Sequence, residues 1–174
     1  MGLDIRAFRG LTRTGDLDFE ALDTIALSWN DDFPGRADDV PPANYTAEDS
    51  FGFRAGSYGG YTAWREQLAK LAGYPAVDHD FGFRGGIEDI RPSHAAAAWD
   101  LDGPLVEAFP FWALVNFSDC EGTIGTAVSA KLAADFAAYQ EKADAHPEEY
   151  FRHLYGEWRK AFEMAADRGA VRFS

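Results

Sequence analysis

Residues 147–174 read PEEYFRHLYGEWRKAFEMAADRGAVRFS, and this stretch decides the fold class. Apolar side chains recur three or four positions apart, which is the spacing of one buried helical face. They are Phe151, Leu154, Trp158, Phe162 and Ala165. Pro147 suits a first helical turn, and Gly169 is expected to end the helix. Val171 and Phe173 then alternate with polar residues, so the stretch predicts a helix followed by a short strand.

Two more segments have helical periodicity. Residues 60–72 place Tyr61, Trp64, Leu68 and Leu71 on one face, and Gly73 with Pro75 ends that helix. Glu66 and Lys70 have the i,i+4 spacing of a surface pair. In residues 126–143, TAVSAKLAADFAAYQEKA, the apolar face is formed by Val128, Leu132, Phe136 and Tyr139. Both segments are predicted to be helices that cover a sheet.

Strands are expected at two further places. Alternation in GLDIRAFRG (2–10) predicts an N-terminal strand, and the apolar run FWALVNF (111–117), which follows Pro110, predicts a buried one. Residues 15–29 fit either a helix, with Phe19, Leu22, Ala26 and Trp29 on one face, or a strand in TIALSW. The fold predicted for residues 1–174 is a single α+β domain, with three or four helices packed on a small, mostly antiparallel sheet.

The net charge and its distribution exclude some classes of function. The net charge is −13, and residues 15–50 hold ten acidic residues and one arginine. Prolines and aspartates near 30–50 predict a long acidic loop. Nucleic-acid binding depends on Lys and Arg, so direct binding of DNA or RNA is not expected. No apolar run reaches the roughly 20 residues that cross a bilayer. A single cysteine and the absence of a secretory leader favour a cytoplasmic location.

The lone cysteine lies in NFSDCEGTIG (116–125), between Asp119 and Glu121. Negative charge on both sides disfavours a thiolate, so the favoured interpretation of Cys120 is an unreactive thiol in a turn that leads into a helix. Ser118 and Glu121 have the spacing of a capping box. The alternative is that Asp119 and Glu121 serve as catalytic acid–base groups or contact a hard cation. The four histidines lack zinc-site spacing, and His79 lies in a predicted loop; no metal and no cofactor are expected.

A second glycine-rich segment is FRAGSYGGYTAWR (53–65), which enters a predicted helix. Backbone N–H groups at a helix N-terminus bind anions readily when an arginine is nearby. Arg54, Ser57, Tyr58 and Arg65 are therefore the predicted ligand-binding residues. The glycine spacing matches neither a Walker loop nor a dinucleotide-binding fingerprint.

Four strings together resemble a family of small uncharacterised proteins of bacteria and their phages. They are the start MGLDI, SFGFRAGSYGGYTAWREQLAKLAGYP (50–75), NFSDCEGTIGTAVSAKLAADF (116–136) and EWRKAFEMAADRGAVRF (157–173). The resemblance spans most of the chain. It implies an intracellular bacterial or phage setting and transfers no activity or catalytic residue.

Three hypotheses of function follow from these features. The first is a binding module whose ligand, a small anion or a protein, meets the loops at 54–61 and 118–125. The second is a hydrolase or transferase in which Asp119 or Glu121 acts as base and an arginine, Arg54 or Arg65, orients an anionic substrate. The third is an acidic, phage-type inhibitor of a nucleic-acid-binding host factor. An enzyme would bring a carboxylate, a thiol or histidine, and an arginine together in one pocket.

Overall fold

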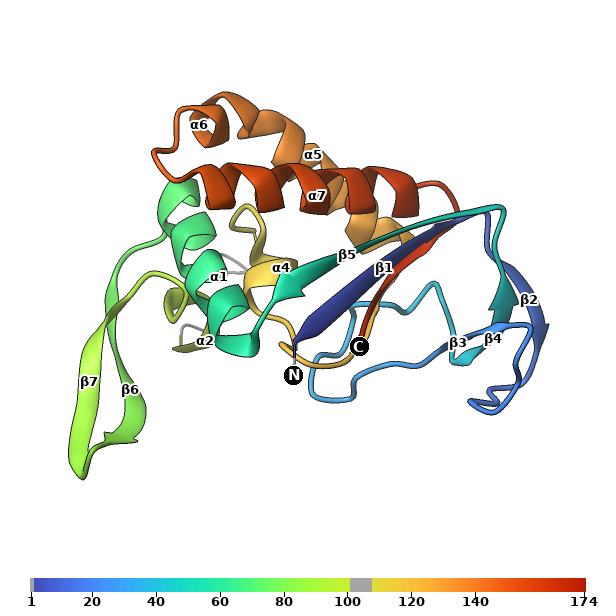
Figure 1. Cartoon of the computed structure of the whole chain (residues 1–174), viewed down its shortest axis with the longest axis horizontal. Coiled ribbons are helices and arrows are strands. Elements are labelled where there is room, and N and C mark those ends of the chain that lie inside the picture. Colours follow the sequence, from blue (N-terminus) through green and yellow to red (C-terminus); the bar gives the residue numbers. More distant parts are fainter. Residues whose placement is uncertain (1, 101–107) are drawn as a thin grey trace.

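A computed structural model of the chain describes residues 2–100 and 108–174. Its centre is a four-stranded sheet in the order β5-β1-β9-β8, in which all neighbouring strands are antiparallel. The strands are β1 (Leu3–Arg9), β5 (Asp49–Gly56), β8 (Gly122–Ile124) and β9 (Ala170–Phe173). Figure 1 shows α7 and α5 lying across one face of this sheet, with α1 beside them. Their bounds are α1 (Tyr58–Ala72), α5 (Thr126–Ala138) and α7 (Glu149–Ala165).

The described residues confirm the α+β class with antiparallel sheets. They contain six helices, of which three are long and three have only four or five residues. The short ones are α2 (Ala97–Asp100), α4 (Trp112–Val115) and α6 (Gln140–Asp144). None of the described helices has both the length and the apolar composition needed to cross a bilayer.

The core lies between the helices and the sheet, and Trp158 is at its centre. The ring of Trp158 lies 5.1 to 5.8 Å, centroid to centroid, from five other aromatic rings. These belong to Phe53, Tyr61, Trp64, Phe162 and Phe173. Every residue of the predicted apolar face of α7 is buried, which confirms the helical reading of 147–169. The helix begins at Glu149, two residues after Pro147.

The predicted strand at 111–117 is wrong, because residues 112–115 form helix α4. Phe111 enters it with a left-handed backbone, φ 63°, and its N–H donates to Asp135 Oδ2 at 2.9 Å. Two buried arginines bind carbonyl groups of the segment: Arg36 Nε donates to Ala113 at 3.2 Å, and Arg65 Nη1 donates to Phe117 at 2.5 Å. A short apolar run has no periodicity that separates a buried strand from a buried helix, so only these contacts decide between them.

The acidic segment is also more ordered than the predicted loop near 30–50. Strand β4 (Ala43–Thr46) is the middle strand of a second sheet, in the order β2-β4-β3, with β2 (Thr12–Gly15) and β3 (Ile25–Leu27) at its edges. It helps form a small second core of Phe8, Leu27, Val40, Ala43, Tyr45 and Ala170. The helical alternative for 15–29 is wrong, since Phe19 is 72% and Leu22 97% exposed. The strand alternative is confirmed by β3.

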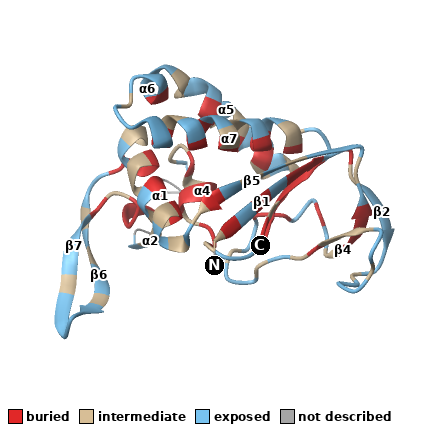
Figure 2. Ribbon diagram, viewed as in Figure 1, coloured by how far each residue is buried: buried red, intermediate tan, exposed pale blue. Residues whose placement is uncertain are grey.

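The predicted loop around His79 is a hairpin instead, formed by β6 (Val77–Arg84) and β7 (Ile87–Ser93). It projects from the body at the end opposite β2 (Figure 1). Figure 2 shows that most of it is exposed. Phe83 and Ile87 are among its exposed apolar residues. Polar contacts with the body lie at its base, where His79 Nδ1 is 2.7 Å from Asp100 Oδ2 and Ser93 Oγ donates to Glu66 Oε2 at 2.6 Å.

Candidate functional site

The turn that holds the lone cysteine borders a cleft of about 510 Å³, which we call the turn cleft. Its lining comes from the loop at 30–33, from α1, from Trp99, and from residues 116–121. The charged residues of the lining are Asp32, Arg65, Asp119 and Glu121. Tertiary structure therefore brings three of the sequence-predicted residues, Arg65, Asp119 and Glu121, to one cleft together with Cys120.

The turn itself is held by Ser118. Its buried Oγ accepts from the backbone N–H groups of Cys120 at 3.2 Å and Glu121 at 3.1 Å, and lies 3.4 Å from Cys120 Sγ. Asn30 Nδ2 donates to the carbonyl of Glu121 at 3.1 Å. The capping-box spacing of Ser118 and Glu121 does not start a helix here, because these bonds close a local turn and helix α5 begins at Thr126. Cys120 and Glu121 are left exposed to solvent.

Arg65 connects α1 to this turn. The residue is only 5% exposed, and its guanidinium lies 4.4 Å above the ring of Tyr61. Besides Phe117, it donates to the carbonyl of Val115 at 3.4 Å and to Thr62 Oγ1 at 3.4 Å, while its Nε has no acceptor among the described residues. Arg65 is therefore the support of the backbone that leads into the turn, and its donors are largely occupied.

The other three predicted ligand-binding residues do not reach the turn cleft. Arg54 lies exposed on β5, on the sheet face opposite the helices. Ser57 is the N-cap of α1, and its Oγ accepts from the N–H of Gly60 at 3.1 Å. Tyr58 is partly buried against the main core. The structure thus separates Arg54, Ser57 and Tyr58 from Arg65, and the four do not form one site.

Replacement of Arg65 tests its supporting role. We expect Arg65→Met to lower the free energy of unfolding by about 2 kcal/mol, because the carbonyl of Phe117 loses this donor and that of Val115 keeps only the indole N–H of Trp99. Urea denaturation followed by circular dichroism measures this. Arg65→Lys keeps the charge but not the forked geometry, and is expected to recover only part of the loss. Equal stability of Arg65→Met and the unmodified protein would contradict the role.

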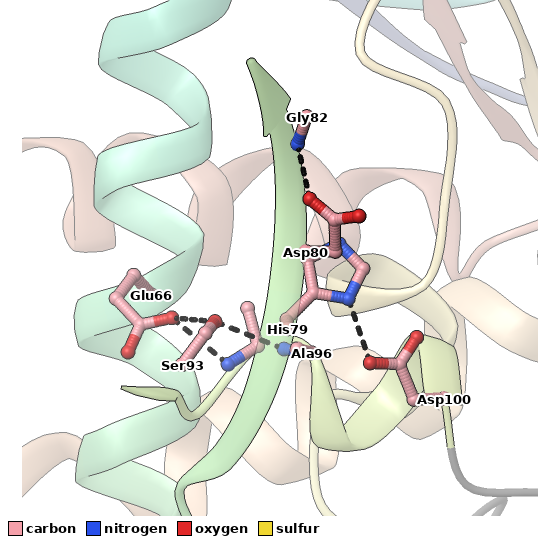
Figure 3. A network of polar contacts seen from close by, with 8 residues as sticks. Glu66, His79, Asp80, Gly82, Ser93, Ala96 and Asp100 are labelled. Carbon is pink, nitrogen blue, oxygen red and sulfur yellow. Dashed lines mark hydrogen bonds and ion pairs between the residues drawn. The ribbon is translucent and has the colours of Figure 1, made fainter. Parts of the chain in front are cut away.

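Sequence reasoning missed a polar network beside the cleft, centred on Glu66 (Figure 3). Glu66 Oε2 accepts from Ser93 Oγ at 2.6 Å and from the N–H of Ala95 at 3.0 Å, and Oε1 accepts from the N–H of His94 at 2.7 Å. The sequence pairs Glu66 with Lys70, whereas the structure uses it to attach α1 to the segment before α2. The one available signal was Ser93 ahead of the alanine run, which is typical of a helix cap.

The Glu66 network predicts a pH dependence. Burial acts to raise the pKa of Glu66 and is the largest single influence, but hydrogen bonds from Ser93, Ala95 and His94 together outweigh it and lower the pKa below its ordinary 4.5. A lowered folded-state pKa means that ionised Glu66 stabilises the fold above pH 4.5, and that this contribution is lost as pH falls through the folded-state value. We expect Ser93→Ala to raise that pKa, as measured by a carboxyl NMR titration. An unchanged titration would show that Ser93 is not a determinant.

The accessible charge of the turn cleft is negative. Asp32 and Glu121 are exposed and Asp119 is half-buried, and none of the three carboxylates has an ion-pair partner within the described ranges. Across residues 2–100 and 108–174, no three His, Cys, Asp or Glu side chains converge as metal ligands. Half-buried Trp99 and Phe33 add aromatic surface to the same lining. The cleft thus has the chemistry to hold an organic cation with an apolar stem.

Comparison with known proteins provides no information on function, so a proposal has to rest on the geometry of the cleft. No protein-family model, no curated protein and no solved structure matches the chain.

Proposed function

We propose that the protein is a binding module whose turn cleft accepts a lysine or arginine side chain of a partner protein. One observation carries the proposal. Three accessible carboxylates line the cleft without ion-pair partners among the described residues, while Arg65, the cation beside them, is buried and bonded to backbone carbonyls. A cationic side chain supplies the missing charge, and its alkyl stem packs on Trp99.

Long-range electrostatics favour the same sign of ligand. The chain has a net charge of −13, and the acidic segment supplies Asp32 to the cleft. Such a field attracts basic partners and repels anions. At the turn cleft it disfavours the small anion expected from the sequence. An acidic, phage-type inhibitor of a nucleic-acid-binding host factor is one form of this proposal, since the surface that such a factor presents to phosphate is basic.

Titration with a basic peptide tests the proposal. Capped hexalysine is added to ¹⁵N-labelled protein, and we expect shift changes at residues 30–33 and 116–121. Hexaglutamate is the matched peptide control. Binding should weaken between 50 and 300 mM NaCl, because the Debye length falls from about 14 to about 6 Å. Shift changes spread evenly over the acidic surface, without preference for these residues, would overturn the assignment of the cleft.

A triple variant makes the test specific. Asp32→Asn, Asp119→Asn and Glu121→Gln together are expected to weaken hexalysine binding about tenfold, since each exposed pair contributes about 0.5 kcal/mol. The control removes the same charge elsewhere through Asp78→Asn, Glu141→Gln and Glu157→Gln, and should change affinity by less than about threefold. Equal effects of the two triple variants would show that net charge, and not the cleft, determines binding.

A hydrolase or transferase is the second candidate. It is favoured because an enzyme of this kind would need a carboxylate, a thiol and an arginine in one pocket. Asp119, Cys120 and Arg65 do line one cleft. Asp119 or Glu121 would act as base, and Arg65 would orient an anionic group with the donor capacity it has left. A panel of p-nitrophenyl esters and phosphate esters provides the screen. Any turnover that survives both Asp119→Asn and Glu121→Gln would exclude these carboxylates as the base.

A further inference from the structure

Two arginines stand side by side on the face of the central sheet that the helices leave uncovered. Leu3, Ile5 and Ala7 of β1 pack into the main core, so the alternate residues Asp4 and Arg6 face the other way. On that face Arg6 lies directly opposite Arg172 of β9. Its neighbour on β5 is Gly52, which has no side chain to cover it. The space that remains is a hollow of about 650 Å³, the sheet hollow, lined by Asp4, Arg6, Ser50, Gly52, Arg172 and Ser174.

This arrangement lacks a negative partner. Like charges directly opposite each other on neighbouring strands are destabilising. Neither arginine forms an ion pair within the described part of the chain, and the buried Nε of Arg172 has no acceptor there. Burial lowers the pKa of Arg172, and the positive charge of Arg6 lowers it further. Such a pair is unexpected in a chain with 29 acidic and 16 basic residues, where a neutralising carboxylate is easy to supply.

The neighbouring charges add to the positive excess. Arg54 of β5 occupies the same face, opposite Asp4, and it too has no ion-pair partner among the described residues. Asp4 is the one acidic side chain in the lining of the hollow. Three arginines and one aspartate therefore meet on this part of the sheet, in a chain whose net charge is −13.

We infer that the sheet hollow binds a phosphate group between Arg6 and Arg172. Guanidinium groups match phosphate oxygens with paired, charge-assisted hydrogen bonds. The negative charge of a phosphate bound between the two guanidinium groups cancels the repulsion across β1 and β9. Ser50 provides a hydroxyl donor in the same lining. The lining of the sheet hollow shares no residue with that of the turn cleft, whose accessible charge has the opposite sign.

Thermal unfolding at constant ionic strength tests the inference. Sodium phosphate is compared with sodium chloride, and glycerol phosphate distinguishes an organic phosphate from the free ion by a larger response. At a tenfold excess over Kd we expect phosphate to raise Tm by about 3–6 °C. Arg6→Gln and Arg172→Gln should each abolish the shift. Arg84→Gln, an exposed arginine of the hairpin outside the hollow, should keep it.

The native protein provides a second readout that no folding defect can obscure. The Nε–Hε resonance of Arg172 is expected to move in a saturable way with phosphate and not with chloride. Without that movement, or with a Tm shift that chloride reproduces at the same ionic strength, the inference fails. A phosphate-dependent shift that persists in both Arg6→Gln and Arg172→Gln would likewise place the anion elsewhere.

Discussion

We expect Trp158→Ala to lower the free energy of unfolding by about 4 kcal/mol, the largest effect that we predict for a core residue. Trp158 is fully buried and touches five aromatic rings from α1, α7, β5 and β9, so its removal leaves a cavity where helix and sheet layers meet. Urea denaturation followed by near-ultraviolet circular dichroism measures the change.

Two variants control this prediction. Trp158→Phe keeps most of the ring contact and removes an indole N–H that has no acceptor among the described residues, so it should cost about 1–2 kcal/mol. Phe83→Ala removes an aromatic ring that is 81% exposed, and should change stability by less than about 0.5 kcal/mol. A loss for Trp158→Ala no larger than that for Phe83→Ala would contradict the central position of Trp158.

Gly169→Ala is expected to destabilise the protein by at least about 3 kcal/mol. A Cβ at this position would lie 2.0 Å from the carbonyl oxygen of Phe8 and 2.9 Å from Cα of Ala165, and both are backbone atoms that cannot rotate away. Relief requires α7 and β1 to separate. The midpoint of urea denaturation measures the loss.

A second glycine provides the matched control. Gly156 lies within α7, and a Cβ there meets no atom within 4 Å. Gly156→Ala should stabilise the protein by up to about 1 kcal/mol, because alanine has the better helix propensity. If the two alanine substitutions had the same sign, the proposed clash at Gly169 would be refuted.

The prediction that the helix ends near Gly169 is correct, but the reason that a glycine is needed there differs from the one that the sequence suggests. The sequence places a glycine at the helix end, where left-handed backbone is common. In the structure Arg168 adopts the positive φ, 48°, and α7 ends at Ala165. Gly169 is needed because β1 passes so close. The position of the boundary was predictable from composition, whereas the contact that requires glycine depends on a strand about 160 positions away.

The candidate site divides in the same way. The segment at 116–125 was recognisable from its glycines and acids. Residues 118–121 do form a turn, but strand β8 follows it before helix α5 begins. Its connection to Arg65 was not recognisable. The guanidinium donates to backbone carbonyls, and every residue has one, so no sequence pattern identifies the partner. The prediction that Arg54 and Arg65 share a ligand rested on nearness along the chain. One points from a strand and the other from a helix, so they reach different surfaces.

Periodicity by itself determined the three long helices, the N-terminal and C-terminal strands, and thus the α+β class, because one-sided burial imposes a repeat of 3.6 or 2 residues that is visible in the chain. Tertiary structure alone decided that 112–115 is helical, that residues 43–46 form strand β4, and which charges meet. Those outcomes depend on hydrogen bonds between residues far apart in sequence, such as Arg36 to Asn116, and on strand register, which sets Arg6 against Arg172. Neither has a local pattern from which it could be predicted.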